Sequence, residues 1–310
     1  MTNWKLTTNT KGKIGNNIFA NLYRCSKILD QEIKCGTKDK TLQVIEREID
    51  YKIEPDDTLI THSGDWGIKK TECKITSKPF YTHTIEHAAH GGVYLNLELK
   101  SVINNVKRWY MTNMSQFLHE KIYPIPLNVN FNIEDIDLDK INQIEKVNLC
   151  YANFSITNPY RIRVAEWAWE QNFIDCNFPK RYPTQDIELN MPMLNGEKLS
   201  SDSFLEKLAS YNFAISPTGN GIDTFRTWEC ILCNTVPIVQ DKWCNRVFSK
   251  IWPMIVVSRY EFCNLLDAIN NFYEKYGNIQ YDHSLLMEEN FEELLDRIQY
   301  ESDRLRWEDV

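Results

Sequence analysis

The sequence predicts an α/β protein built around parallel β-sheets, and three observations support this. Short apolar runs of strand length alternate with segments whose apolar residues recur at helical spacing. Polar, glycine-containing turns follow several of these runs, as expected at the carboxyl ends of parallel strands. At 310 residues with 43% hydrophobic content, the chain is also long enough for about two domains with cores of their own.

The N-terminal half opens with a strand, a loop and a helix, and then continues with further strands. The expected elements are a strand at Trp4–Thr7, a loop at Lys11–Asn17, a helix at Ile18–Leu29, a buried strand at Asp57–His62 followed by the turn Ser63–Gly67, a strand at Lys78–Tyr81 and a helix at Ser101–Glu120. Ligands of open α/β sheets lie beyond the carboxyl ends of the strands. The polar turn at Ser63–Gly67 is therefore a candidate binding segment.

The C-terminal half alternates strands and helices regularly. Its expected strands are Val147–Ala152, Asn212–Ser216, Val236–Gln240 and Met254–Val257, and its expected helices are Arg161–Gln171, Phe204–Ser210, Asp223–Asn234 and most of Glu261–Asp309. Pro124 and Pro126 interrupt the chain ahead of this half, and an acidic stretch follows at Phe131–Ile144. We therefore expect a domain boundary between about residues 125 and 146, which divides the chain into residues 1–145 and 146–310.

Charge and cysteine content narrow the class of protein. A net charge of −8 and a pI of about 5.4 argue against non-specific nucleic-acid binding, which needs a basic surface. Nine scattered cysteines favour a reducing compartment over a disulfide scaffold. The N-terminus has no apolar signal segment, and no window approaches the length of a membrane span. We expect a cytoplasmic protein.

The segment Phe213–Gln240, FAISPTGNGIDTFRTWECILCNTVPIVQ, is the most informative one. It predicts a strand, a Gly-rich loop, a helix and a second strand. Glycines let the loop backbone approach a ligand, and the amides at the helix start favour a phosphate. Arg226 could then bind a diphosphate, and Glu229, on the same helix face, could bind ribose hydroxyls. The alternative is an ordinary turn, with Asp223 as helix N-cap and Arg226–Glu229 as a surface pair.

This segment resembles the C-terminal signature of exostosin-like glycosyltransferases, which reads roughly S-P-R-G-N-G-x-D-x-x-R-x-W-E, a helix, then G-x-x-P-I-V. The matching positions are Ser216, Pro217, Gly219, Asn220, Gly221, Asp223, Arg226, Trp228, Glu229, Pro237, Ile238 and Val239. Two positions depart from the pattern. Thr218 stands where the family has Arg, which removes one possible phosphate contact, and Asn234 stands where it has Gly.

A second segment, Leu149–Arg163, is similar to a strand and turn of the same family. Its pattern Y-x-N-F-x-x-x-T-N-x-x-R is resembled by Tyr151, Asn153, Phe154, Thr157, Asn158 and either Arg161 or Arg163, with two residues instead of three between Phe154 and Thr157. The resemblance places this loop opposite the nucleotide, with one of the two arginines touching phosphate. The alternative is a strand-to-helix turn followed by surface arginines.

The resemblance implies the GT-B fold, in which two Rossmann-like domains face each other across a cleft. Residues 1–145 would bind the acceptor and residues 146–310 the donor, with the last helices crossing back to the first domain. It implies a UDP-sugar donor such as UDP-xylose, with GDP as the second choice, a glycan or other hydroxyl acceptor, and no required metal or cofactor. The implied donor-binding residues are Asn158, Arg161, Arg163, Ser216, Gly219, Asn220, Gly221, Asp223, Thr224, Arg226 and Glu229.

An inverting reaction would need a base from the N-terminal domain to deprotonate the acceptor. Asp65 is the first candidate, because it follows a buried strand on a Gly-flanked loop, and His62 is the second; Glu86 and His90 come after them. Asp65 could equally be a turn-forming residue. The loop KGKIGNNIF is similar to a G-x-x-G-N loop of fucosyltransferases, and it contributes the acceptor-binding candidates Gly15, Asn16 and Asn17. Trp66, in the turn after the buried strand, and His90 are the other acceptor-binding candidates.

Two other functions compete with the transferase. The first is a zinc hydrolase, because His83, His87 and His90 lie at spacings that place them on one helix face, where three histidines can hold a catalytic zinc. The second competitor is a sugar- or nucleotide-binding protein without turnover, because nine tryptophans and fifteen tyrosines offer stacking surfaces. Most of these aromatic residues are expected in the core, and we favour the transferase.

Overall fold

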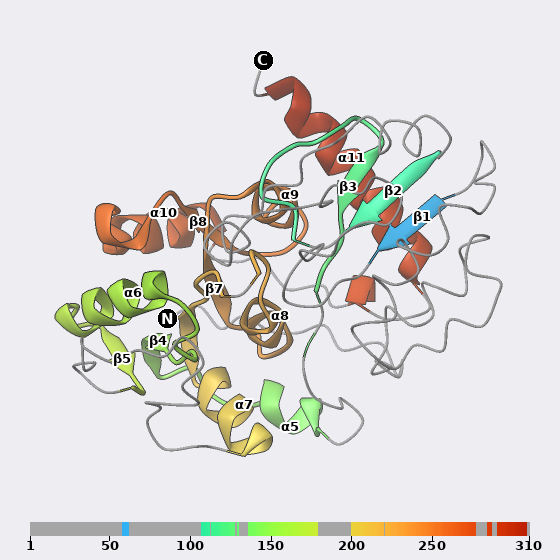
Figure 1. The fold of residues 1–310 in the computed structure, drawn as a ribbon. Helices are drawn as coiled ribbons and strands as arrows, with labels where there is room; N and C mark the ends of the chain where they lie inside the picture. The colour runs from blue at the N-terminus through green and yellow to red at the C-terminus, as the bar shows by residue number, and fades with distance from the viewer. Residues whose placement is uncertain are drawn as a thin grey trace.

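The computed structural model describes residues 58–61, 107–111, 113–127, 129, 136–178, 200–219, 221–276, 284–286 and 290–308. These residues form two parallel β-sheets with helices around them (Figure 1). The mixed α/β class with parallel sheets is therefore confirmed. The arrangement of two facing domains and the boundary at residue 145 stay predictions.

The larger sheet has five parallel strands in the order β5-β4-β6-β7-β8. The strands are β4 (Asn148–Ala152), β5 (Ile174–Cys176), β6 (Tyr211–Ile215), β7 (Val236–Gln240) and β8 (Ile255–Val257). This order is one of the two common in doubly wound sheets. The strand order reverses between β4 and β6, because β5 lies on one side of β4 and the later strands lie on the other. The loops after β4 and β6 therefore meet at the edge where such folds bind ligands.

Helices connect these strands and cover both faces of the sheet. They are α5 (Leu138–Asn142), α6 (Pro159–Glu170), α7 (Ser201–Ala209), α8 (Phe225–Leu232), α9 (Trp243–Phe248) and α10 (Leu265–Tyr276). On one face, the ring of Phe213 contacts Phe272 and Tyr273 of α10. On the other, Ala214 packs with residues of α7 and α8 such as Leu208 and Cys230. In Figure 1, α6 and α10 lie together, apart from α5 and α7.

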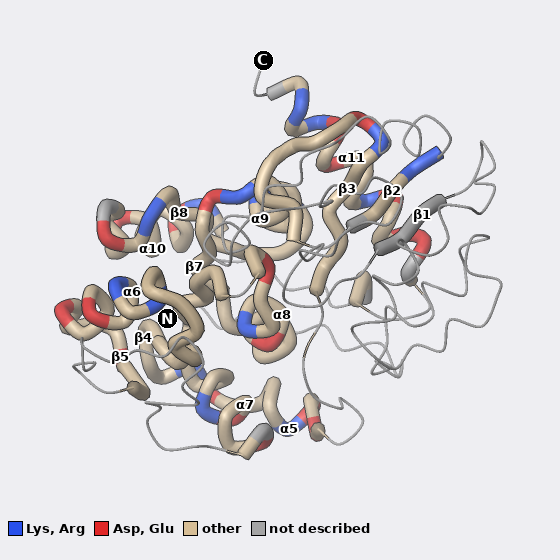
Figure 2. The backbone as a smooth tube through the Cα atoms, in the orientation of Figure 1, with Lys and Arg blue, Asp and Glu red and all other residues tan. Residues whose placement is uncertain are grey.

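Apolar composition explains why the strands of this sheet are central. Strands β4, β6, β7 and β8 contain no charged residue, and β6 and β7 are buried along their whole length. Such continuous apolar runs are typical of parallel strands covered on both faces. Charged residues of the described part gather on the helices instead (Figure 2).

The smaller sheet has three parallel strands in the order β1-β2-β3, which are β1 (Thr58–Thr61), β2 (Arg108–Met111) and β3 (Ile122–Pro124). The C-terminal helix α11 (Phe291–Glu308) lies beside it (Figure 1). Arg108 pairs with Asp296 at 3.3 Å, and Arg306 Nη1 donates to the Glu120 carbonyl at 2.8 Å. Two short 3-10 helices, Tyr260–Phe262 and Ser284–Leu286, complete the described elements.

Both sheets contribute to one continuous hydrophobic core, which includes Trp109 of β2, Ile238 of β7 and Ile298 of α11. The segment between β2 and β3 also bonds to the larger sheet's helices. The amides of Trp243 and Cys244, at the start of α9, donate to the carbonyls of Ser115 and Met114 at 2.9 and 3.0 Å. The described parts of the two sheets are therefore packed together.

Most predicted C-terminal elements are confirmed to within a few residues. The helix predicted at Ser101–Glu120 is wrong over residues 108–111, which form β2, and over residues 113–120, which contain no helix. Trp109 and Tyr110 are both buried although their side chains leave the strand on opposite faces, because β2 is covered on both sides. The sequence analysis missed β3, β5, α5 and α9. The elements predicted at Trp4–Thr7, Lys11–Asn17, Ile18–Leu29, Ser63–Gly67 and Lys78–Tyr81 lie outside the described residues.

No helix among the described residues is both long enough and apolar enough to cross a membrane.

Candidate functional site

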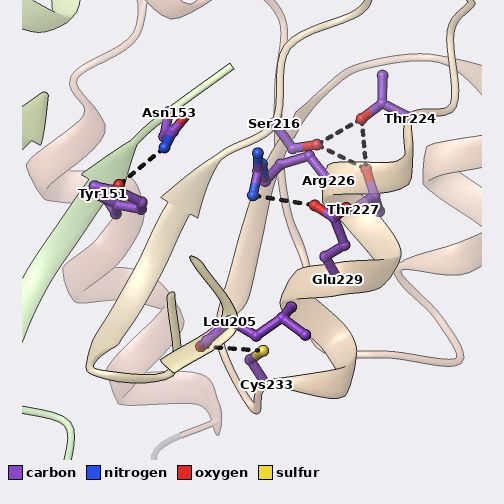
Figure 3. Close-up of polar contacts among 9 residues, drawn as sticks. All are labelled: Tyr151, Asn153, Leu205, Ser216, Thr224, Arg226, Thr227, Glu229 and Cys233. Carbon is purple, nitrogen blue, oxygen red and sulfur yellow. Dashed lines mark hydrogen bonds and ion pairs between the residues drawn. The ribbon is translucent and has the colours of Figure 1, made fainter. Parts of the chain in front are cut away.

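The Gly-rich segment occupies the predicted place, between β6 and α8 at the carboxyl edge of the larger sheet. Its residues are buried from Ser216 to Gly219 and from Gly221 to Thr224, and Asn220 lies outside the described part. A cluster of three hydroxyls stands at the start of α8 (Figure 3). Ser216 Oγ lies 2.9 Å from both Thr224 Oγ1 and Thr227 Oγ1. The sequence analysis missed Thr227, although its spacing of three from Thr224 was a usable signal.

Helix α8 begins at Phe225 with Thr224 as its N-cap, so Asp223 is not the N-cap that the alternative interpretation expected. The Thr224 side chain makes no capping hydrogen bond, because its hydroxyl lies within the Ser216 cluster. Thr224 therefore provides no side-chain cap for the first turn of α8. The start of a helix attracts anions.

Arg226 and Glu229 form the ion pair that the alternative interpretation expected on one face of α8, but both side chains are mostly buried rather than on the surface. Arg226 Nη1 lies 3.1 Å from Glu229 Oε2, and the two side chains are 16% and 12% exposed (Figure 3). The guanidinium carbon of Arg226 stacks 3.9 Å from the ring centroid of Phe204 in α7, a partner that no sequence pattern linked to it. The Nε of Arg226 is buried and makes no hydrogen bond among the described residues. A charged donor thus stands at the first turn of α8.

Arg161 and Asn158 link the loop after β4 to the loop after β6. Arg161 donates from Nε to the Thr218 carbonyl at 3.0 Å, from Nη2 to the Pro217 carbonyl at 2.9 Å and from Nη1 to the Ser155 carbonyl at 2.7 Å. Asn158 caps α6 by accepting from the Arg161 amide, and its Nδ2 donates to the Gly219 carbonyl at 2.8 Å. The structure therefore brings together the two segments that the sequence analysis singled out.

Asp223 holds the segment that follows β3. Its Oδ2 accepts from the Leu127 amide at 2.7 Å, both carboxylate oxygens lie 2.9 Å from Trp228 Nε1, and its own amide donates to Asn113 Oδ1 at 2.8 Å. The residue is 1% exposed. These contacts give Asp223 a role in joining the two sheets, while its predicted contact with a donor stays a prediction.

Arg163 lies away from the Gly-rich loop, on the side of the 3-10 helix Tyr260–Phe262. Its Nε is 3.8 Å from Glu261 Oε1, its guanidinium lies over the Tyr160 ring, and its side chain is 56% exposed. Arg259 reaches the same Glu261 oxygen at 3.8 Å. Of the two arginines left open by the sequence, Arg161 is the one that contacts the Gly-rich loop.

The two departures from the family pattern both have local explanations. Thr218 donates its hydroxyl to Gln240 Oε1 at 2.7 Å, at the end of β7. Asn234 has a φ of 55°, a left-handed conformation that Gly adopts most easily and Asn next. The amides of Asn234 and Thr235 donate to the carbonyls of Ile231 and Cys230 at 3.1 and 2.9 Å. These two bonds are those of a Schellman motif, so Asn234 fulfils the helix-ending role of the family's Gly.

The six described cysteines are free thiols, and burial raises the pKa of each. Cys230 and Cys233, which have CxxC spacing, are fully buried in the core. Raised pKa values keep thiols protonated, and protonated thiols are poor nucleophiles and metal ligands. This chemistry favours a packing role for both residues.

The predicted acceptor side and the predicted base lie outside the described residues. These positions are Gly15, Asn16, Asn17, His62, Asp65, Trp66, His83, Glu86, His87 and His90. Within the described ranges, no group of three or more His, Cys, Asp or Glu residues could hold a metal ion. The zinc alternative on His83, His87 and His90 is therefore neither supported nor opposed by the geometry.

No protein-family model matches the chain, and no curated protein matches it.

Proposed function

We propose that this protein is a glycosyltransferase that binds a nucleotide-sugar at the β6–α8 unit. The observation that supports it best is the combination at the start of α8, where the N-cap Thr224 makes no side-chain capping bond and the buried Nε of Arg226 makes no hydrogen bond among the described residues. The unit lies at the carboxyl edge of a parallel sheet, where doubly wound folds bind nucleotides. The resemblance to exostosin-like transferases over the same residues supports the same assignment.

In this proposal the diphosphate of a UDP-sugar lies at the N-terminus of α8. The helix dipole and the Arg226 guanidinium stabilise the negative charge that develops on the leaving diphosphate, so catalysis needs no metal. The Glu229 carboxylate accepts hydrogen bonds from the ribose hydroxyls. Asp65, or His62 in its place, deprotonates the acceptor hydroxyl in an inverting transfer.

Calorimetric titration with UDP, GDP and their sugars tests this assignment. We expect one nucleotide class to bind, and at a concentration 100 times its dissociation constant to stabilise the fold by about 2.7 kcal/mol. Arg226→Ala should weaken binding at least about tenfold, because it removes the charged donor from the diphosphate. Arg297→Ala is the matched control, since it removes a half-exposed arginine from α11. If neither nucleotide class binds the wild type, the proposal is wrong.

A binding protein without turnover is the second candidate, and Thr218 favours it. This residue replaces the arginine of the family signature, and its hydroxyl is held by Gln240. Incubation of the protein with the bound nucleotide-sugar and a panel of glycan acceptors separates the two candidates. Release of free UDP together with a glycosylated product supports the transferase, whereas binding without either product supports the binding protein.

A further inference from the structure

Arg161 and Asn158 together take four backbone carbonyls from two loops, those of Ser155, Pro217, Thr218 and Gly219. We propose that these two residues, hereafter the carbonyl clamp, hold the Gly-rich loop in its ligand-binding shape without touching the ligand. Arg161 is then a positioning residue. This inference rests on the proposed function, because it concerns the same nucleotide site.

The geometry of the Arg161 side chain suits it to this task. It is 8% exposed, and its three nitrogens each donate to a different carbonyl. A planar guanidinium presents its donors in a fixed fork, so three bonds fix the relative positions of three peptide groups. A lysine ammonium has no such fork. The side chain also joins the loop after β4 to the loop after β6, so in this proposal the ligand binds on another side of the Gly-rich loop.

The clamp also determines where the loop amides point. In a trans peptide the carbonyl and the following amide point in opposite directions, and the described residues contain no cis peptide. Since the Pro217 and Thr218 carbonyls face Arg161, the amides of Thr218 and Gly219 face away from it. The Gly219 amide closes the turn on the Gly221 carbonyl at 2.9 Å. The clamp thus directs the Thr218 amide toward the ligand side, as an oxygen-rich group such as a phosphate requires, while the Gly219 amide is held within the turn.

Gly219 shows how closely the loop fits the clamp. A Cβ at this position would lie 2.6 Å from Arg161 Nη2 and 2.9 Å from its Cζ, closer than such atoms approach. The φ of Gly219 is outside the left-handed region, so the backbone conformation alone does not require glycine. The glycine is needed for the approach of Arg161. A glycine that the sequence analysis assigned to the ligand therefore serves the clamp.

Arg161→Lys and Arg161→Met test the clamp by two measurements. The first is hydrogen exchange of the loop amides at residues 218–221, which we expect to accelerate at least about tenfold as the loop loosens. The second is the affinity of the folded protein for UDP, or for GDP if that nucleotide binds, measured over a range of salt concentrations. We expect affinity to fall about tenfold with an unchanged salt dependence, because no charge is removed from the ligand's contacts.

Two comparison variants make the result specific. Arg226→Ala removes a proposed ligand contact, so it should lower both the affinity and its salt dependence. Lys146→Met removes a different buried cation, which also binds backbone carbonyls but at the opposite edge of the sheet. It should leave the exchange of residues 218–221 and the nucleotide affinity unchanged within about twofold. If the removal of any buried cation were enough to loosen the loop, Lys146→Met and Arg161→Met would change the exchange of residues 218–221 and the nucleotide affinity by similar factors.

The outcomes separate the clamp from the proposed function. If the wild type binds neither nucleotide, the proposed function fails, and the exchange measurement still decides whether Arg161 fixes the loop. Wild-type exchange and affinity in Arg161→Lys would overturn the clamp, as would a loss of salt dependence equal to that of Arg226→Ala. If Arg161→Met does not fold, Arg161→Lys and Gly219→Ala, which disturbs the clamp from the loop side, provide the same readouts.

Discussion

Two buried cations stand at opposite edges of the five-stranded sheet, and both bind backbone carbonyls. At the carboxyl edge Arg161 binds carbonyls of loop residues. At the amino edge Lys146 Nζ donates to the carbonyls of Ala209 and Tyr211 at 2.9 Å, of Cys233 at 3.1 Å, and to Thr235 Oγ1 at 3.1 Å. The two residues look alike in chemistry, but the groups they hold differ.

The acceptors of Lys146 belong to regular structure. Ala209 and Cys233 lie at the C-terminal ends of α7 and α8, where helix dipoles favour a cation, and Tyr211 is the first residue of β6. All three residues thus belong to a helix or strand, or cap one. The carbonyls held by Arg161 belong to loop residues. We therefore expect Lys146 to act on the ends of helices and of a strand, and Arg161 to act on the shape of a loop.

The largest expected difference between the two edges is in the pH dependence of stability, to which Lys146 contributes and Arg161 does not. Burial lowers the pKa of Lys146 from 10.5 to about 8. Between these two values the unfolded chain binds the proton more than the folded chain does, so stability rises with pH. We expect the free energy of unfolding of the wild type to rise by about 3 kcal/mol relative to Lys146→Met between pH 8 and 10.5.

Urea unfolding of both proteins at several pH values measures this difference, and subtraction of the variant removes the contribution of the tyrosines. A guanidinium stays charged throughout this range, so the carboxyl edge should show no such dependence. A flat difference curve would mean that the carbonyls hold the ammonium charged despite its burial. The two edges would then differ only in the groups they fix.

Gly219→Ala tests the close fit at the carboxyl edge and should have the next largest effect. The added methyl group overlaps Arg161 Nη2, so we expect Gly219→Ala, introduced alone into the wild-type protein, to lower the free energy of unfolding by about 2 kcal/mol. In an Arg161→Ala background the same change meets a vacated space. A double-mutant cycle by urea unfolding should then give an interaction energy of about 1 kcal/mol or more.

The same cycle between Gly219→Ala and Lys146→Met should give no interaction, because these residues lie at opposite edges of the sheet. Additivity in the first cycle would show that Gly219 is not required by Arg161. The Gly-rich loop at the carboxyl edge would then not be packed tightly against Arg161.

The sequence predicted the parts of this site that local pattern determines. Apolar runs located β4, β6, β7 and β8, and the Gly-rich loop was correctly placed between β6 and α8. The pairing of Arg226 with Glu229 followed from helical spacing. Strands β3 and β5 have three residues each, which is too short for a periodic signal.

Long-range partners could not be predicted. Arg161 and the Thr218 carbonyl are 57 residues apart, and they meet because β4 and β6 are neighbours in the sheet. Asp223 has the residue type and the position of an N-cap, yet its carboxylate accepts from the Leu127 amide, 96 residues away. In both cases the partner is a backbone group, which every residue carries and which leaves no trace in the sequence.

The smallest expected effect concerns the end of α8, where the Cys233 carbonyl meets Lys146. Asn234 has a φ of 55° there, and a Cβ without a polar side chain is strained in this conformation. Asn234→Ala should therefore cost about 1 kcal/mol, whereas Asn234→Gly should stay within about 0.5 kcal/mol, since relief of strain offsets the lost bond to Asn142. Urea unfolding measures both. If Asn234→Ala were as stable as Asn234→Gly, the backbone at residue 234 would be able to leave the left-handed conformation without cost. The rigidity of the amino edge would then depend on Lys146 and not on the end of α8.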